Sequence, residues 1–508
     1  MPHLIGIDVG TTGSKVLVID EEGRVRGSYT AEYPLYTPKP GWSEQHPEDW
    51  WRATVKAVKE AVKRSRVDPS SIEGISLTGQ MHGLVILDKN YDIIRPAILW
   101  NDQRTAKEAE YINKLFGEKI IEITGSMAHT GFTAPKILWV RNNEPSNFEK
   151  IHKFMLPKDY IGFKLTGDIV TDVNDASGTT LFDVKKRSWS YEIMSELKIS
   201  SDIVPRAIES QEIRGELEPE VAKELGLKPH IPVGAGAGDQ GAAGVGAGAI
   251  EEGIISVNIG TSGVVFTGSD EYRYDPLGRL HSFCHAVPAK WHLMGVMLAA
   301  GGSLRWFRDN LGHLERILGS LMDEDPYNLL TREAERIPIG SEGLIFLPYL
   351  SGERTPHADP YARGVFFGIS LKHGKGHMVR SILEGVAFGL MNSLELMMEL
   401  GIKPREVRIL GGGSRSKLWR KIIADVFGVG VYTLEVDEGS SYGAAILASV
   451  GAGLYKSVKD AVDSMIKRKE FIEPDMELHE RYKPYYEIYN RLYRDLRKEF
   501  RELAKIHS

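Results

Sequence analysis

The chain has 508 residues, of which 42% are hydrophobic and 26% charged, an ordinary composition for a globular protein and a length that favours two domains. Its formal charge of −6 argues against a nucleic-acid or anionic-membrane binder, because no basic excess exists to attract phosphate polymers. The single cysteine, Cys284, excludes an internal disulfide and a multi-cysteine zinc site.

The first residues of the chain pass directly into a strand pattern. No charged segment followed by a long apolar segment precedes it, so no signal peptide is predicted. No apolar run reaches the roughly 20 residues that a membrane helix needs. We therefore expect a cytoplasmic protein with no nucleic-acid or membrane partner.

Two segments of the chain resemble each other. Residues Leu4–Asp20 and Ile254–Thr267 each contain an apolar strand, a Gly-Thr-[Thr/Ser]-Gly turn and a second apolar strand. Apolar, largely β-branched runs around a glycine-containing turn predict a hairpin. The separation of the two copies by about half the chain suggests a duplicated domain.

Strand and helix patterns alternate around these hairpins. Residues 75–78, 84–88 and 407–410 are predicted as strands, and residues 50–63, 418–427 and the Tyr-rich tail 479–506 as helices. This alternation predicts an α/β fold. The Gly/Ala-rich stretch 234–249 is the expected junction, which gives domains at residues 1–248 and 249–508.

The first hairpin carries Asp8 at the end of a predicted strand. A carboxylate there can hold a hydrated Mg²⁺, and the turn that follows can present N–H groups and Thr hydroxyls to phosphate oxygens. A plain hairpin with a solvated Asp is the alternative. The second copy, Gly260–Gly263, favours the phosphate interpretation, and Asn258 stands there in place of the Asp.

Asp239 is the only charged residue between Val233 and Ile250. A carboxylate among buried backbone is costly unless something uses it. Phosphoryl transfer to a sugar hydroxyl needs a carboxylate that accepts the proton. The alternative is a helix cap, and the two interpretations are compatible.

Two further segments are candidate ligand contacts. Gln80–Gly83 follows a predicted strand, with Trp100 and its polar neighbours shortly after, a composition typical of a sugar pocket. An isolated histidine such as His82 is more often structural than a ligand contact. Gly411–Ser416 lies between a predicted strand and a helix, where a Gly-rich turn often approaches a nucleotide; the alternative is a plain tight connection.

Together these residues resemble the FGGY family of carbohydrate kinases, over about residues 4–455. Gly131–Trp139 is similar to one family signature, and Gly364–Ile369 with His377–Glu384 is similar to the other. The family resemblance implies two actin-like (ribonuclease-H-like) domains with a nucleotide and sugar cleft between them. It also makes a homodimer plausible.

By this resemblance the site residues can be assigned by position. Asp239 matches the catalytic base and Asp8 the Mg²⁺-associated carboxylate. The expected sugar contacts are Met81, His82, Trp100, Asp239 and Gln240. The expected nucleotide contacts are Thr11, Thr12, Thr261, Gly301, Trp306, Gly412, Gly413 and Ser416.

The form of the sugar loop, Gln80–Gly83, is similar to that of family members that phosphorylate xylulose. The expected reaction is therefore ATP-dependent phosphorylation of a ketopentose, D-xylulose, with Mg²⁺. Gln240 stands where many such kinases have Asn, which leaves another ketose or polyol, such as ribulose or glycerol, as an alternative. A non-catalytic actin-like nucleotide-binding protein is the other alternative.

Overall fold

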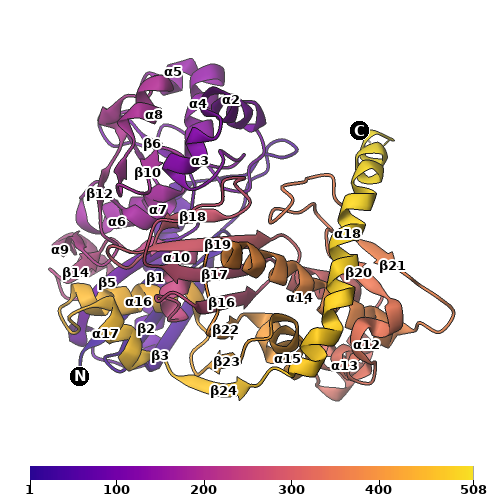
Figure 1. Cartoon of the computed structure of the whole chain (residues 1–508). Coiled ribbons are helices and arrows are strands. Elements are labelled where there is room, and N and C mark those ends of the chain that lie inside the picture. The colour runs from indigo at the N-terminus through magenta and orange to yellow at the C-terminus, as the bar shows by residue number, and fades with distance from the viewer. Residues whose placement is uncertain (507–508) are drawn as a thin grey trace. The chain divides into compact units, whose positions relative to one another are not determined.

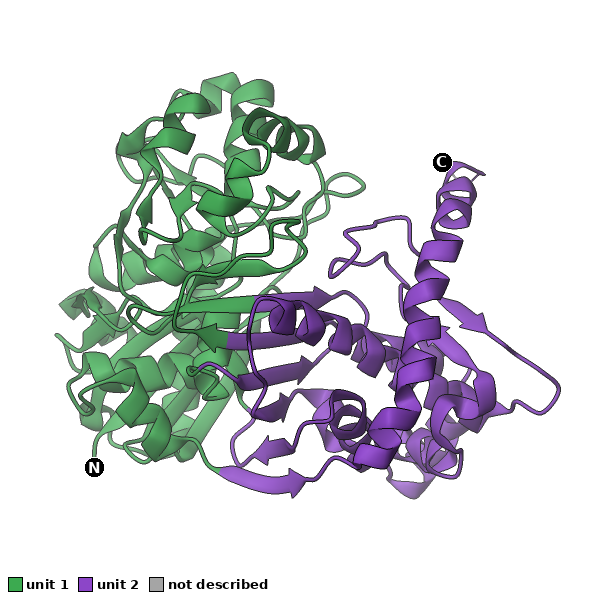
Figure 2. Ribbon diagram, in the orientation of Figure 1, with its two compact units in different colours: residues 1–251, 268–293, 438–467 green, residues 252–267, 294–437, 468–508 purple. Residues whose placement is uncertain are grey.

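The chain is organised around two sheets, each of which contains an antiparallel hairpin (Figure 1). The computed structural model describes residues 1–506. The chain divides into two compact units, which are coloured separately in Figure 2. Unit 1 contains residues 1–251, 268–293 and 438–467, and unit 2 contains residues 252–267, 294–437 and 468 onward. Both combine mixed sheets with helices, which confirms the predicted α/β class.

The sheet of unit 1 has the order β13-β14-β5-β1-β2-β3, with β15 also paired to β5. Strand β1 pairs antiparallel with β2 and parallel with β5, which confirms the first predicted hairpin. The strands are β1 (His3–Val9), β2 (Gly13–Asp20), β3 (Val25–Glu32), β5 (Ile72–Gly79), β13 (Ile213–Glu216), β14 (Pro232–Gly234) and β15 (Ala237–Gly238).

Helices cover both faces of this sheet, which explains why the interiors of β1 and β2 are almost continuously apolar and buried. Helix α1 (Pro47–Ser65) packs against β2 and β3, and α16 (Gly439–Gly451) packs against β1 and β5. The other helices of unit 1 are α2 (Ala106–Phe116), α3 (Lys119–Thr124), α4 (Thr133–Asn143), α5 (Pro145–Phe148), α6 (Pro157–Thr166), α7 (Val173–Ser177), α8 (Tyr191–Glu196), α9 (Pro219–Leu225), α10 (Asp239–Gly246) and α17 (Val458–Met465).

Short strand pairs complete unit 1. They are β4 (Glu44–Gln45) with β7 (Ala97–Ile98), β6 (Val85–Leu87) with β8 (Lys153–Met155), β9 (Val170–Asp172) with β12 (Arg206–Ile208), and β10 (Phe182–Asp183) with β11 (Ser188–Trp189). Strand β18 (His281–Cys284) also belongs to this unit, and β19 spans Trp291–Met297.

Unit 2 repeats the hairpin pattern. Strand β16 (Ile254–Ile259) pairs antiparallel with β17 (Gly263–Ser269) and parallel with β22 (Glu406–Leu410), in the order β17-β16-β22-β23-β24. The second predicted hairpin is therefore confirmed. The remaining strands are β23 (Val431–Leu434), β24 (Arg468–Ile472), and the pair β20 (Ile345–Leu347) and β21 (Val365–Phe367).

The helices of unit 2 include the buried α14 and the C-terminal α18, the yellow helix in Figure 1. Tyr482 and Tyr489 of α18 are buried, so the Tyr-rich tail packs within this unit. The helices are α11 (Gly301–Asn310), α12 (His313–Met322), α13 (Pro326–Glu335), α14 (Lys375–Glu399), α15 (Lys417–Phe427) and α18 (Met476–Ile506).

The units do not follow one cut in the sequence. The predicted boundary after residue 248 lies close to the end of the first segment of unit 1 at Glu251. Residues 268–293 and 438–467 belong to unit 1, although the prediction placed them in the second domain. The Gly/Ala-rich stretch forms β15 and α10 inside unit 1.

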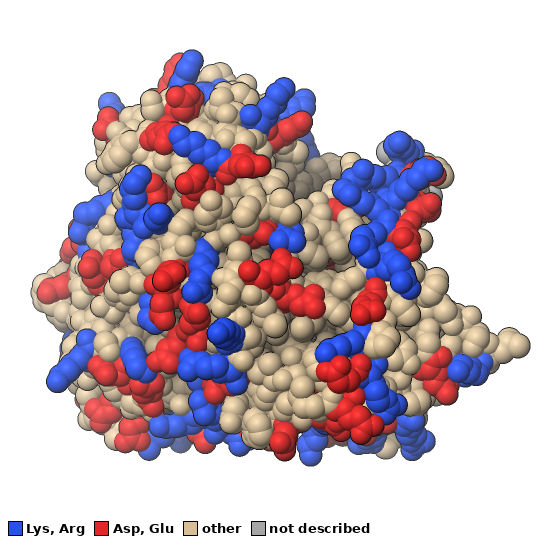
Figure 3. Space-filling model, viewed as in Figure 1, with Lys and Arg blue, Asp and Glu red and all other residues tan. Residues whose placement is uncertain are grey.

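Charged side chains of both signs are interspersed over the face shown in Figure 3. Within residues 1–506, no helix has both the length and the apolar character needed to cross a membrane.

Candidate active site

The turn between β1 and β2 is held by side chains from three other segments. Gln45 Nε2 donates to the Thr11 carbonyl at 2.7 Å, and Trp100 Nε1 donates to Thr11 Oγ1 at 2.9 Å. Thr11 Oγ1 in turn donates to Gln80 Oε1 at 3.3 Å. Thr12, the next residue, is exposed. These contacts join the predicted phosphate turn to Trp100 and to the loop that begins at Gln80.

Asp8 lies at the end of β1, directly before this turn. Ser440 Oγ donates to its Oδ2 at 2.5 Å, whereas its Oδ1 is buried and accepts no hydrogen bond from any residue between 1 and 506. Burial raises the pKa of the Asp8 carboxyl, although the Ser440 hydrogen bond and the Lys15 charge act in the opposite direction. Lys15 itself pairs with Glu438 at 2.6 Å.

The unsatisfied oxygen of Asp8 fits a hard cation such as Mg²⁺, which prefers oxygen ligands. Across residues 1–506 no group of three or more His, Cys, Asp or Glu side chains is arranged as a metal site. A Mg²⁺ held by Asp8 would therefore take most of its ligands from water and from the substrate phosphates.

Asp239 is the first residue of α10, directly after β15, and Gly238 rather than Asp239 is the N-cap. Burial, and then the negative charge of Asp8, raise the pKa of Asp239 to about 7, against the effect of the backbone N–H of Gln240. A carboxyl with this pKa is matched to accept a proton near neutral pH. Gln240 is half-buried beside it on the same helix turn.

The predicted sugar loop lies next to Asp239. An added Cβ at Gly238 would lie 2.7 Å from Met81 Cγ, so Met81 packs against the residue before Asp239. His82 Nδ1 lies 2.7 Å from the carbonyl oxygen of Gly178. The Gly238 N–H donates at 3.0 Å to Asn174 Oδ1, on the helix that ends just before Gly178. Unit 1 therefore brings Met81, His82 and Asp239 together.

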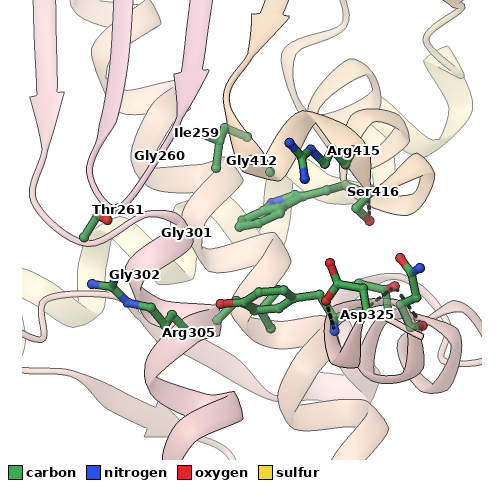
Figure 4. Close-up of a pocket in the computed structure, with 16 residues that line it drawn as sticks. Ile259, Gly260, Thr261, Gly301, Gly302, Arg305, Asp325, Gly412, Arg415 and Ser416 are labelled. Carbon is green, nitrogen blue, oxygen red and sulfur yellow. Dashed lines mark hydrogen bonds between the residues drawn. The ribbon is translucent and has the colours of Figure 1, made fainter. Parts of the chain in front are cut away.

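Unit 2 contains a separate cavity of about 310 Å³ near the turn of its own hairpin (Figure 4). Figure 4 shows Thr261, Gly301 and Arg305 on one side and Gly412, Arg415 and Ser416 on another. The Gly301 N–H donates to the Gly260 carbonyl at 2.9 Å, which brings α11 close to the hairpin turn. Backbone turns at two helix starts suit a phosphate-bearing ligand.

Five residues expected at the nucleotide line this cavity, namely Thr261, Gly301, Gly412, Gly413 and Ser416. Trp306 does not; it is partly exposed on α11. Thr11 and Thr12 belong to unit 1.

Sequence reasoning missed several residues of both sites. The cavity is also lined by Asp325, Tyr327, Asn328 and Thr331 at the start of α13, and by Trp419 on α15. Asp325 caps α13 by accepting from the Tyr327 N–H at 2.9 Å, and the Asp325-Pro326 pair is a helix-start signal. That signal predicts a helix end but nothing about a ligand. No sequence pattern indicated that Ser440 would contact Asp8.

Residues 3–246 match the N-terminal domain, and residues 255–452 the C-terminal domain, of the FGGY family of carbohydrate kinases. The xylulose kinase of Escherichia coli (strain K12) is 40% identical over 97% of this chain and 99% of its own. A ligand-bound xylulose kinase structure from Lactobacillus acidophilus is 28% identical with a TM-score of 0.91, covering 99% of this chain and all of its own. The gluconokinase of Bacillus subtilis (strain 168) is 33% identical, over 99% of this chain and 98% of its own. The predicted family and fold are confirmed.

Proposed function

Because the chain belongs to the FGGY family of carbohydrate kinases, we propose that it transfers the γ-phosphoryl group of ATP to D-xylulose, giving D-xylulose 5-phosphate and ADP. The family implies ATP as a substrate. The choice of sugar is supported by the 40% identity to a xylulose kinase over nearly the whole of both chains. The grouping of Met81, His82 and Asp239 in unit 1 is the observation that carries the proposal.

In this proposal unit 1 binds the sugar and unit 2 binds the nucleotide. The sugar lies against Met81, His82, Trp100 and Gln240, with its reactive hydroxyl near Asp239. The cavity beside Gly301 and Gly412 holds the nucleotide. Thr261, which lines this cavity, faces its phosphates, and Thr11 and Thr12 keep the phosphate role that the family resemblance assigns to them.

Asp239 is the proposed general base. Its carboxylate accepts the proton of the sugar hydroxyl as that oxygen attacks the γ-phosphorus, and the bond between this phosphorus and the ADP oxygen breaks. A pKa of about 7 leaves a large deprotonated fraction near neutral pH while keeping the group basic. Mg²⁺ held at Asp8 would supply positive charge to the transferring phosphoryl group.

A substrate panel tests the function. ADP release is measured with Mg·ATP and D-xylulose, D-ribulose, L-ribulose, L-xylulose, glycerol or D-gluconate. We expect the highest kcat/KM for D-xylulose. A higher kcat/KM for another of these compounds would make that compound the substrate instead of D-xylulose. Gln240, whose side chain is longer than that of Asn, would then be the first residue to test for the changed preference. ADP release that no sugar stimulates would contradict the proposed activity.

A further inference from the structure

His82 has a backbone conformation that a residue with a side chain seldom adopts. Its φ is +67°, in the left-handed region that favours glycine. Such a conformation persists only where surrounding contacts fix it, and it is often associated with ligand-binding positions. The contacts that fix His82 therefore bear on how its ring meets a sugar.

Those contacts come from Phe132, the N-cap of α4, and from the first turn of that helix. The His82 carbonyl oxygen accepts from Lys136 Nζ at 2.7 Å and from Thr133 Oγ1 at 3.1 Å. The His82 ring is stacked on the Phe132 ring, with centroids 4.0 Å apart and planes 11° apart. Both the backbone and the ring of His82 are thus held by one short segment of the chain.

The ring is also held in one tautomer. Nδ1 lies 2.7 Å from the Gly178 carbonyl oxygen, which can only accept a hydrogen bond. Nδ1 must therefore carry a hydrogen, and in the neutral ring the lone pair lies on Nε2.

Burial of the Lys136 amine costs free energy. Its side chain is fully buried, and burial lowers the pKa of its ammonium group well below the usual range, with partial compensation from Asp102. A buried amine needs a hydrogen-bond partner, and the His82 carbonyl is that partner at 2.7 Å.

We propose that Lys136 is a positioning residue for the sugar site: its Nζ fixes His82 in the left-handed conformation, so that the imidazole, whose tautomer the Gly178 carbonyl sets, meets the sugar in one orientation. The proposal rests on the proposed sugar-binding role of His82. Holding a contact residue in place before the ligand arrives lowers the cost of ordering it on binding. Lys136 itself does not touch the sugar.

A double-mutant cycle tests this role. The wild type, Lys136→Met, His82→Ala and the double variant are compared by KM for D-xylulose, kcat and KM for ATP. In the wild-type background, Lys136→Met is expected to raise the sugar KM about 5- to 50-fold, because contacting residues couple this strongly. In the His82→Ala background it should change the sugar KM by less than about 2-fold. The KM for ATP should not change.

Lys150→Met is the matched control, because Lys150 is exposed and the chemical change is identical. It should leave the sugar KM unchanged. Equal losses from Lys136→Met in both backgrounds, or a rise in the KM for ATP, would overturn the positioning role and leave the proposed function intact. A wild type that turns over no sugar would overturn both.

Lys136→Met also removes a buried group and can unfold the protein. In that case Thr133→Val, which removes the second donor to the His82 carbonyl, takes its place in the same cycle. The expected result is a smaller rise in the sugar KM that again disappears in the His82→Ala background. Persistence of that rise in His82→Ala would contradict the proposal.

Discussion

Asp239 is the one charge in a long run of small and apolar residues, and the fold brings it under the influence of a residue far away in the chain. Its raised pKa comes from burial and from the negative charge of Asp8. His82 likewise depends on a distant segment, because its carbonyl accepts from Lys136 while its φ is positive.

Replacing the proposed base tests its role directly. Asp239→Asn keeps the size of the side chain but removes the proton acceptor, so turnover should fall about 10²- to 10⁴-fold. Binding of ATP, measured by titration calorimetry, should persist. The exposed Asp92→Asn variant should keep wild-type turnover. If the turnover of Asp239→Asn stays within about 3-fold of that of the wild type, Asp239 is not the general base.

The pKa of Asp239 also predicts how stability depends on pH. Its folded-state pKa, about 7, lies above the ordinary value of 3.8, so the folded protein holds this proton more tightly than the unfolded chain. The contribution of this group to stability is therefore full below about pH 4 and is lost as pH rises through 7. Asp239→Asn should raise the melting temperature more at pH 8 than at pH 5, in protein without nucleotide or metal. An equal difference at both pH values would contradict the raised pKa.

At the scale of elements, α10 and α16 pack with their backbones in close approach. An added Cβ at Gly443 would lie 1.8 Å from the Ala242 carbonyl oxygen, and α10 begins with Asp239. The sequence predicted neither this contact nor the position of α16 in unit 1, because runs of small residues suit many helix contacts. Local hairpins and long amphipathic helices were predictable; long-range helix pairing was not.

Gly443→Ala should therefore separate the two helices. Because the atoms it meets are backbone, the cost should be about 1–3 kcal/mol or more, and turnover should fall as α10 shifts Asp239. Urea unfolding and the ADP-release assay measure the two effects. Gly374→Ala is the control, since an added Cβ there meets nothing within 4 Å. Unchanged stability in Gly443→Ala would show that the helices are farther apart.

A buried ion pair within α14 is linked to the C-terminal helix α18 by the hydroxyl of Tyr482, which also accepts from Arg380 Nη2 at 2.8 Å. Arg380 Nε donates to Glu384 Oε1 at 2.8 Å, and the Tyr482 hydroxyl donates to the same oxygen at 3.0 Å. Glu384→Gln leaves the buried Arg380 without a counter-charge, so the free energy of unfolding should fall by about 3–5 kcal/mol. The exposed Glu399→Gln on the same helix should change it by less than about 0.5 kcal/mol. Denaturant titration measures the free energy of unfolding of both variants. Equal losses in the two would show that the Arg380–Glu384 ion pair does not stabilise the fold more than an exposed glutamate does.

At the scale of the whole chain, neither unit is encoded by one continuous segment. A composition-based cut near residue 248 finds the end of a long segment but cannot reveal that residues 438–467 return to unit 1. Residues 438–467 belong to unit 1 because α16 covers β1 and β5. The apolar residues of these strands predict burial, but they do not indicate which helix covers them.

A fragment of residues 1–251 should consequently fail to fold. Without α16, the apolar faces of β1 and β5 are exposed to water. We expect the fragment to lack protection of its amides against hydrogen exchange, whereas β1 in the full chain is protected. Adding a synthetic peptide of residues 438–467 should restore part of that protection. A fragment that is protected by itself would show that α16 is dispensable.

The same arrangement has a consequence for biosynthesis. The strands of unit 1 leave the ribosome first, but the helix that covers them begins only at Gly439. The last strand of this sheet, β15, ends at Gly238, about 200 residues before α16 begins. At synthesis speeds of about 5–20 residues per second, the complete sheet therefore waits roughly 10 to 40 s before the helix that covers it is made. During that interval its apolar face is a target for chaperones, and rare codons between residues 252 and 437 would lengthen the exposure and lower the yield of native protein.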